Sequence, residues 1–150
     1  MLRFEQQSIE LFEQLQDHKK MVLSTALHNH VTSRMMSFII LDGTFYFQTD
    51  IMLRKYSQIK QNPQVSICAE NIQIEGICKE LGHPSVSSHF CTLFARYYPG
   101  SYQLYTHLDN ERLLTVTPTF VQRWIYENKV PFIETFDFPN QLYSKIAYQK

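Results

Sequence analysis

The hydrophobic positions near the start of the chain repeat with the period of a helix. Phe4, Leu11, Phe12 and Leu15 fall on one face, and the other face carries acidic and polar residues (Glu5, Glu10, Glu13 and Gln14). Cations at 18–20, within the run Asp17-His18-Lys19-Lys20, suit the C-terminal end of a helix, where the dipole favours positive charge. The spacing therefore predicts an amphipathic helix that closes within 17–20.

The next stretch has the β-branched content and turn residues of antiparallel strands. Turn signals at 28–30 and at Asp42-Gly43 separate three strand-like segments, 21–27, 31–41 and 44–49. A helix is predicted over 51–62, where Asn62 precedes a proline and so disfavours further helix. Two more strands are expected over 65–69 and 72–78, the second with strict alternation of apolar and polar residues.

The second half of the chain mixes one helix with aromatic-rich strands. An apolar stripe from Val86 to Tyr97 predicts a helix that Pro99-Gly100 stops, and an aromatic turn follows at 102–105. Strands are expected over 112–117 and 120–126, and the tail from Val130 reads as an extended arm or an edge strand.

Closure of these strands into a barrel is the expected architecture. Five or six short antiparallel strands would otherwise leave exposed sheet edges, and the helices are too few to cover both faces of an open sheet. We found no internal repeat and no linker. The prediction is one mainly β domain over 1–150, a split antiparallel β-barrel with flanking helices.

Composition narrows the functional classes. Positive and negative side chains balance to a net charge of zero, which gives no support for a nucleic-acid or an anionic-membrane partner. Three cysteines without a CxxC spacing predict neither a disulfide framework nor a zinc site, and Cys68 and Cys78 read as small core residues. The six histidines have no spacing that completes a metal-ligand set. With polar residues at the N-terminus in place of a signal peptide, the expected location is the cytoplasm.

Two short runs carry candidate chemistry. In the run from Thr49 to Lys55, Arg54 and Lys55 stand at the start of a predicted helix, where the dipole already favours an anion. Arginine and lysine there can bind a phosphate, with a hydroxyl from Thr49, although a solvated pair on an amphipathic helix is the simpler interpretation of such cations.

The run from Ser33 to Ser37 lies within a predicted strand. Arg34 is either an outward-facing arginine beside two core methionines, Met35 and Met36, or a cation beside a planar heterocycle that meets the strand's backbone.

In their order and context, the two runs resemble the FMN-binding split-barrel family of pyridoxamine 5′-phosphate oxidase. The similar stretch covers roughly residues 20–80 and continues through Val65–Cys68 to Ile74-Glu75-Gly76. The resemblance implies that Arg34, Met35, Met36 and Ser37 line the isoalloxazine and ribityl chain of FMN. It implies further that Gln48 and Thr49 lie along the ribityl-phosphate, and that Arg54 and Lys55 bind the phosphate.

The resemblance also implies a homodimer with flavin at the interface, to which Asn71 is contributed by the neighbouring subunit. The substrate would be a small redox molecule, and the activity that of an FMN-dependent oxidoreductase. Ile39 stands where the true oxidase has a substrate-binding lysine, which argues against pyridoxamine 5′-phosphate oxidation itself. The alternative is a non-catalytic binding module that stores or senses flavin, haem or another planar ligand.

Overall fold

The computed structural model describes residues 2–149, without the side chain of Leu2. Helix α1 (Leu2–Leu15) buries the predicted apolar face, but it ends earlier than expected. Gln16 adopts a left-handed backbone with φ 64°, and strand β1 (His18–Leu27) begins two residues later. The cations at 18–20 therefore belong to a strand and not to the end of a helix.

Six antiparallel strands close into the predicted barrel. After β1 come β2 (His30–Leu41), β3 (Thr44–Asp50), β4 (Gln64–Ala69), β5 (Ile72–Gly82) and β6 (Glu111–Glu127). Their order is β3-β2-β1-β4-β5-β6, and pairing of β3 with β6 closes the ring. The β1–β2 and β2–β3 connections are the tight turns that the sequence predicted, with positive φ at their central residues.

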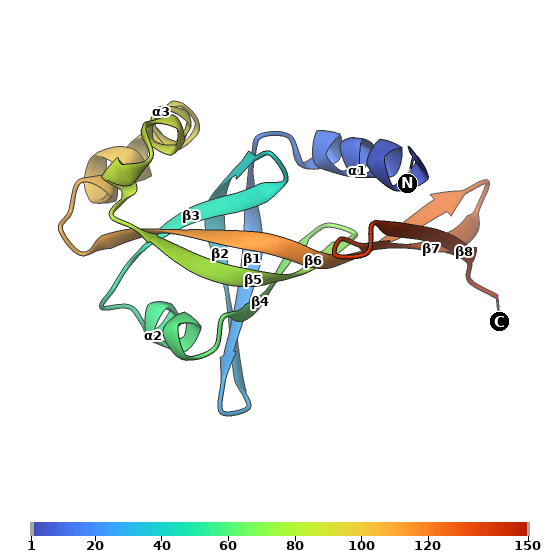
Figure 1. Cartoon of the computed structure of the whole chain (residues 1–150), viewed down its shortest axis with the longest axis horizontal. Coiled ribbons are helices and arrows are strands. Elements are labelled where there is room, and N and C mark those ends of the chain that lie inside the picture. The colour runs from blue at the N-terminus through green and yellow to red at the C-terminus, as the bar shows by residue number, and fades with distance from the viewer. Residues whose placement is uncertain (1, 150) are drawn as a thin grey trace.

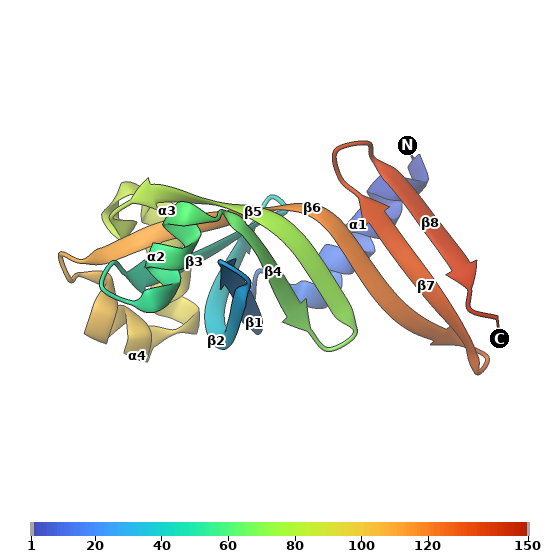
Figure 2. The same cartoon turned by 90° about the horizontal axis from the view of Figure 1, so that it is seen from below.

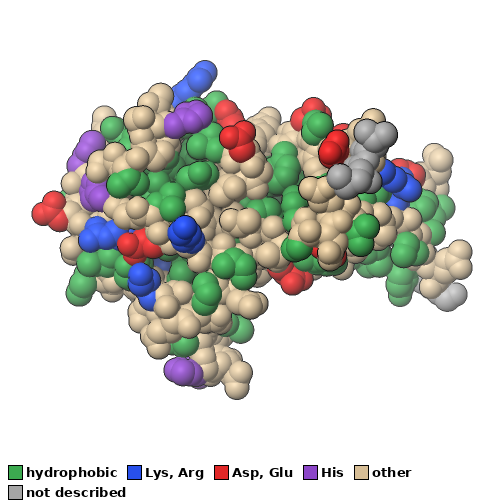
Figure 3. Space-filling model, viewed as in Figure 1, with side chains coloured by type: hydrophobic (Ala, Val, Ile, Leu, Met, Phe, Trp, Pro, Cys, Tyr) green, Lys and Arg blue, Asp and Glu red, His purple; other side chains and the backbone are tan. Residues whose placement is uncertain are grey.

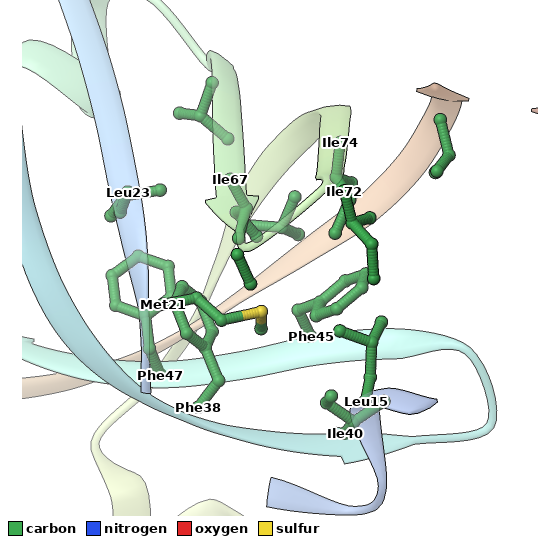
Figure 4. Packing of buried hydrophobic residues seen from close by; sticks show 14 of the residues in the cluster. Leu15, Met21, Leu23, Phe38, Ile40, Phe45, Phe47, Ile67, Ile72 and Ile74 are labelled. Atoms are coloured by element: carbon green, nitrogen blue, oxygen red, sulfur yellow. The ribbon is translucent and has the colours of Figure 1, made fainter. Parts of the chain in front are cut away.

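The barrel is filled by aliphatic and aromatic side chains from the inward faces of its strands. Met21, Leu23, Phe38, Phe47 and Ile67 are at most 1% exposed and point toward one another (Figure 4). A second buried cluster lies outside the barrel, where α3 (Ser88–Tyr97) packs on β2 and β6. Its members are Ile39, Phe90, Phe94, Tyr98 and Leu113.

Strand β6 is one long strand, where two were predicted. The expected break falls at Pro118, but the register between β5 and β6 shifts there, so that Glu75 pairs with Phe120 and Gly76 pairs with Pro118. Thr119 is the extra, unpaired residue, and proline is tolerated beside such a bulge because the hydrogen-bond ladder is interrupted there. The strand then continues past the barrel, where β7 (Val130–Asp137) pairs with β6 and β8 (Leu142–Ala147) pairs with β7.

The tail from Val130 is thus a β-hairpin, not a single arm. It projects from one end of the barrel beside α1, and both termini lie at this end (Figures 1 and 2). Phe4 of α1 packs against Phe136 and Phe138, which anchors the helix to the extension.

The remaining helices lie at the opposite end of the molecule. Helix α2 (Arg54–Gln61) is shorter than predicted, because Asp50 accepts a hydrogen bond from the Met52 backbone and holds 51–53 in a turn. Helix α3 ends at Tyr97, as predicted, but Pro99 does not end the helical region. It opens α4 (Pro99–Ser101), which runs into a π-helix (Tyr102–Thr106), since proline is tolerated in a first helical turn.

The two cysteines that were predicted to be core residues differ in burial. Cys78 is buried as predicted, but Cys68 is exposed, because it lies on the outward side of β4. Within residues 2–149, no helix is long and apolar enough to cross a membrane.

Gly76 of β5 leaves no room for a side chain beside β6, and its replacement by alanine is expected to destabilise the fold. A Cβ there would meet the Val116 Cγ1 at 2.5 Å and the Thr117 carbonyl oxygen at 2.7 Å. We expect Gly76→Ala to lower the free energy of unfolding by roughly 1–3 kcal/mol, measured by urea denaturation. Gly100→Ala is the control, since nothing lies within 4 Å of its added Cβ. Equal stabilities of the two variants would contradict the expectation.

Candidate functional site

A cleft opens between β2, β3 and the helical segment that follows β5. Its volume is about 440 Å³, within the roughly 300–1,000 Å³ typical of small-molecule sites. Six of the nine residues that the sequence singled out line it: Met35, Met36, Ser37, Gln48, Thr49 and Lys55. The rest of the lining comes from later in the chain or from the turn before α2: Asp50, Leu53, Phe94, Ser101, Tyr105 and Glu111.

Because side chains alternate along a strand, residues 33–37 of β2 point toward two opposite faces of the sheet. Met35 is 62% exposed at the cleft, whereas Met36 packs against the barrel core. The two methionines are therefore not both core residues. Ser37 lies on the same outward face as Met35, as residues two apart in a strand must.

Arg34 does not line the cleft but is held in a polar network inside the strand pair. Its guanidinium donates to the hydroxyls of Thr25 (2.8 Å) and Thr32 (2.6 Å). Both hydroxyls in turn donate to the side-chain carbonyl of Gln58, which is 4% exposed. The outward, solvated interpretation of Arg34 is wrong: the side chain is half-buried and its orientation is set by α2.

The three cations of the two runs influence one another. Burial lowers the pKa of Arg34, and the nearby charge of Arg54 lowers it further. Burial is likewise the main cause that lowers the pKa of Lys55, with repulsion from Arg34 second. This grouping favours an anion, because a bound anion would relieve both the repulsion and the loss of hydration.

Arg54 and Lys55 point to different places. Lys55 lines the main cleft, whereas Arg54 lines a separate cavity beside His28 and His30 of the β1–β2 hairpin. On the face shown in Figure 3, a small group of basic side chains lies over and beside α2, with acidic side chains among them. The structure thus keeps the predicted cations near one another but places only Lys55 in the cleft.

Thr49 and Gln48 lie at the base of the cleft. The Thr49 side chain is 3% exposed, and its hydroxyl has no hydrogen-bond partner within residues 2–149. An unpaired buried hydroxyl is costly unless a ligand satisfies it. The Gln48 side-chain carbonyl accepts a hydrogen bond of 2.9 Å from Thr106 at the end of the π-helix, which orients its amide.

Sequence reasoning missed Glu111, a buried carboxyl in the same cleft. It pairs with Asp50 where β3 meets β6, and its side chain is 4% exposed. Burial raises the pKa of Glu111 to about 7, and the charge of Asp50 adds to the rise while Lys55 opposes it. No local signal marks this residue, because its neighbours come from strands about sixty positions away.

The pKa of Glu111 predicts a pH-dependent stability. The folded protein binds the proton more tightly than the unfolded chain, whose value is near 4.5, so stability falls as the pH rises from about 4.5 through 7. Glu111→Gln removes this loss. The difference in the free energy of unfolding between Glu111→Gln and the parent chain, measured by urea denaturation, should be larger in favour of the variant at pH 8 than at pH 5. The expected change in this difference is roughly 1–3 kcal/mol. The exposed Glu10→Gln serves as control, and an advantage of the same size at both pH values would contradict the assignment.

Asn71 and Ile39 lie outside the cleft. Asn71, in the β4–β5 turn, donates to the Trp124 carbonyl at 2.7 Å and accepts from Gln14 at 3.2 Å. Ile39 is fully buried beneath α3. Among the residues that the structure describes, no three His, Cys, Asp or Glu side chains are grouped to hold a metal ion.

The closed six-stranded barrel with a lateral cleft over β2 and β3 defines a protein of the split-barrel class. The family model described as pyridoxamine 5′-phosphate oxidase matches residues 8–125, so the chain belongs to this family. None of the curated proteins compared with the chain matches it.

Solved structures agree on the fold at low sequence identity. A pyridoxamine 5′-phosphate oxidase-related, FMN binding protein from Nostoc punctiforme is 15% identical with TM-score 0.64, over 98% of this chain and 97% of that chain. PhzG from Burkholderia lata, solved with tetrahydrophenazine-1-carboxylic acid, is 12% identical with TM-score 0.66, over 99% and 92%. HutZ, the haem storage protein from Vibrio cholerae, is 13% identical with TM-score 0.57, over 75% and 88%.

Proposed function

We propose that the chain is an FMN-binding flavoprotein and acts as an oxidoreductase on a small redox substrate. The observation that carries the proposal is the cleft itself, which is lined by residues of both sequence runs. In this cleft Lys55 lies with the buried Thr49 hydroxyl, which has no hydrogen-bond partner among residues 2–149. A phosphate there satisfies the hydroxyl and neutralises the grouped cations.

Each part of FMN has a counterpart in the chain. Lys55 and Thr49 hold the phosphate, Arg54 adds positive charge from the neighbouring cavity, and Gln48 lies along the ribityl chain. Met35, Met36 and Ser37 line the isoalloxazine, and Arg34, fixed behind the strand by Thr25 and Thr32, adds positive potential there. The bound flavin would supply electron or hydride transfer, while the protein supplies position and electrostatics.

We further propose that two copies form the complete site. Met35 leaves 62% of its surface exposed at the cleft, which suits a planar ligand covered from outside. Asn71 lies away from the cleft of its own chain, so it can meet a flavin only in a neighbouring subunit.

The free cysteines at 68, 78 and 91 agree with a reducing compartment such as the cytoplasm.

The test is to compare FMN with riboflavin, which lacks the phosphate. Titration of the purified protein, followed by flavin absorbance and fluorescence, is expected to show saturable FMN binding and at least about tenfold weaker riboflavin binding. Equal affinities, or no binding of either, would overturn the proposal. Oxidation of a reduced nicotinamide by the FMN-loaded protein supports an enzyme. Tight FMN or haem binding without turnover supports the storage or sensing alternative.

Thr49→Val separates ligand binding from folding. Because the buried hydroxyl has no partner within residues 2–149, its replacement by a methyl group should keep or raise the thermal stability of the ligand-free protein. FMN binding should weaken by roughly three- to tenfold, since one hydrogen bond to a charged phosphate is lost. Thr117→Val, at an exposed position of β6, is the matched control, and loss of stability in Thr49→Val would argue for a structural role.

A further inference from the structure

A second cavity adjoins the proposed flavin cleft. It has a volume of about 330 Å³ and lies between β1, β2 and the α3–α4 junction. Ser37 and Ser101 line both this cavity and the main cleft. A ligand in the second cavity can therefore reach the ring that the main cleft is proposed to hold.

Among residues 2–149, Lys20 is the one charged side chain that lines the second cavity. It pairs with Ser37 in the β1–β2 register, so the two side chains stand on the same outward face. The neighbouring Lys19 points to the other face and pairs with Glu70 at 2.9 Å. Lys20 takes part in no ion pair within the part of the chain that the structure describes.

Among residues 2–149, two of the hydroxyls that line the second cavity are hydrogen-bonded to the protein through their side chains, and two are not. The Tyr98 hydroxyl donates to the Phe38 carbonyl at 3.0 Å, and the Tyr97 hydroxyl donates to Asp17 at 3.2 Å. The hydroxyls of Ser37 and Ser101 have no side-chain hydrogen bond to any residue among 2–149. An ammonium group and two free hydroxyls, without a carboxylate in the lining, match the oxygens of an anion.

We propose that the second cavity binds an anionic group of the substrate, a carboxylate or a phosphate, through Lys20. The rest of the substrate passes Ser37 and Ser101 to lie against the isoalloxazine. Lys20 is then a specificity residue, which selects substrates that carry a negative charge at one end. The inference rests on the proposed flavin function for its meaning, but the anion site has an independent measurement.

The experiment uses small aromatic probes on the FMN-loaded protein. Benzoate, phenyl phosphate and the neutral benzamide are titrated while the visible flavin spectrum is recorded. We expect saturable spectral shifts with benzoate or phenyl phosphate, the stronger of the two identifying the anion, and at least about tenfold weaker binding of benzamide. Lys20→Met should weaken the anionic probes by about tenfold or more and leave benzamide unchanged.

Controls keep the two proposals apart. Lys19→Met, on the same strand but the opposite face, should bind the anionic probes like the parent chain, and Lys20→Met should keep the parent affinity for FMN. Calorimetric titration of the flavin-free protein with the same probes measures the anion site even if FMN does not bind. Equal binding of benzoate, phenyl phosphate and benzamide, or parent-like affinity in Lys20→Met, would overturn the inference while leaving the flavin proposal intact.

Discussion

Lys55→Ala is expected to weaken FMN binding by roughly 10- to 100-fold, the effect of losing a charge-assisted contact to phosphate in a partly buried site. Lys55 is the one cation of the predicted pair that lines the cleft, and burial together with Arg34 already lowers its pKa. Removing it relieves that repulsion, so the ligand-free protein should unfold at the same or a higher temperature. The measurement is an FMN titration beside a thermal melt.

Two control variants test whether the loss of FMN binding is specific to Lys55. Arg54→Ala should have a smaller effect on FMN than Lys55→Ala, because Arg54 lines the cavity beside the β1–β2 hairpin. Lys60→Ala, an exposed cation in the last turn of α2, should leave FMN binding unchanged. Riboflavin affinity should be the same in all of these variants. A Lys55→Ala protein with the parent affinity would place the phosphate elsewhere.

Glu134→Ala is expected to lower the free energy of unfolding by roughly 3–5 kcal/mol, the cost of leaving a buried charge without its partner. Glu134 is 2% exposed and accepts from the Arg123 Nε at 2.6 Å. Arg123 also donates to Gln14 of α1, and the Tyr143 hydroxyl of β8 donates to the Glu134 carboxylate. The network therefore joins α1 and β8 to the middle of the extension.

The matched control is Glu127→Ala. Glu127, at the end of β6, is an exposed ion-pair partner of Lys145 in β8. That change should cost no more than about 1 kcal/mol, as surface ion pairs do. Replacing Arg123 and Glu134 together by Met and Leu should recover much of the loss, because no buried charge remains unpaired. Urea denaturation followed by far-UV circular dichroism measures all three. Equal costs for Glu134→Ala and Glu127→Ala would contradict the buried-pair interpretation.

Local patterns were sufficient for much of the barrel. Alternation and tight-turn residues predicted β1 to β5 because each hairpin turn brings sequence neighbours into pairing. The same rules failed at Pro118, where a bulge that depends on the partner strand lets β6 continue. At Pro99 they placed the end of α3 correctly but missed α4, because proline is compatible with both the end of one helix and the first turn of the next.

The candidate site divides in the same way. The sequence alone predicted that the runs from Arg34 to Ser37 and from Thr49 to Lys55 contribute to one site, and the end of β2, a turn and β3 are all that separate the two runs. Met35, Met36, Ser37, Thr49 and Lys55 line one cleft, whereas Arg34 and Arg54 do not. Which side chains enter the cleft was decided by tertiary structure, since Thr25, Thr32 and Gln58 hold Arg34 behind the strand. Glu111 and Lys20 also became candidates only through tertiary structure, because Glu111 pairs with Asp50 of β3 and Lys20 lies beside the α3–α4 junction. The desolvation and the neighbours that give these side chains their chemistry come from segments distant in the sequence.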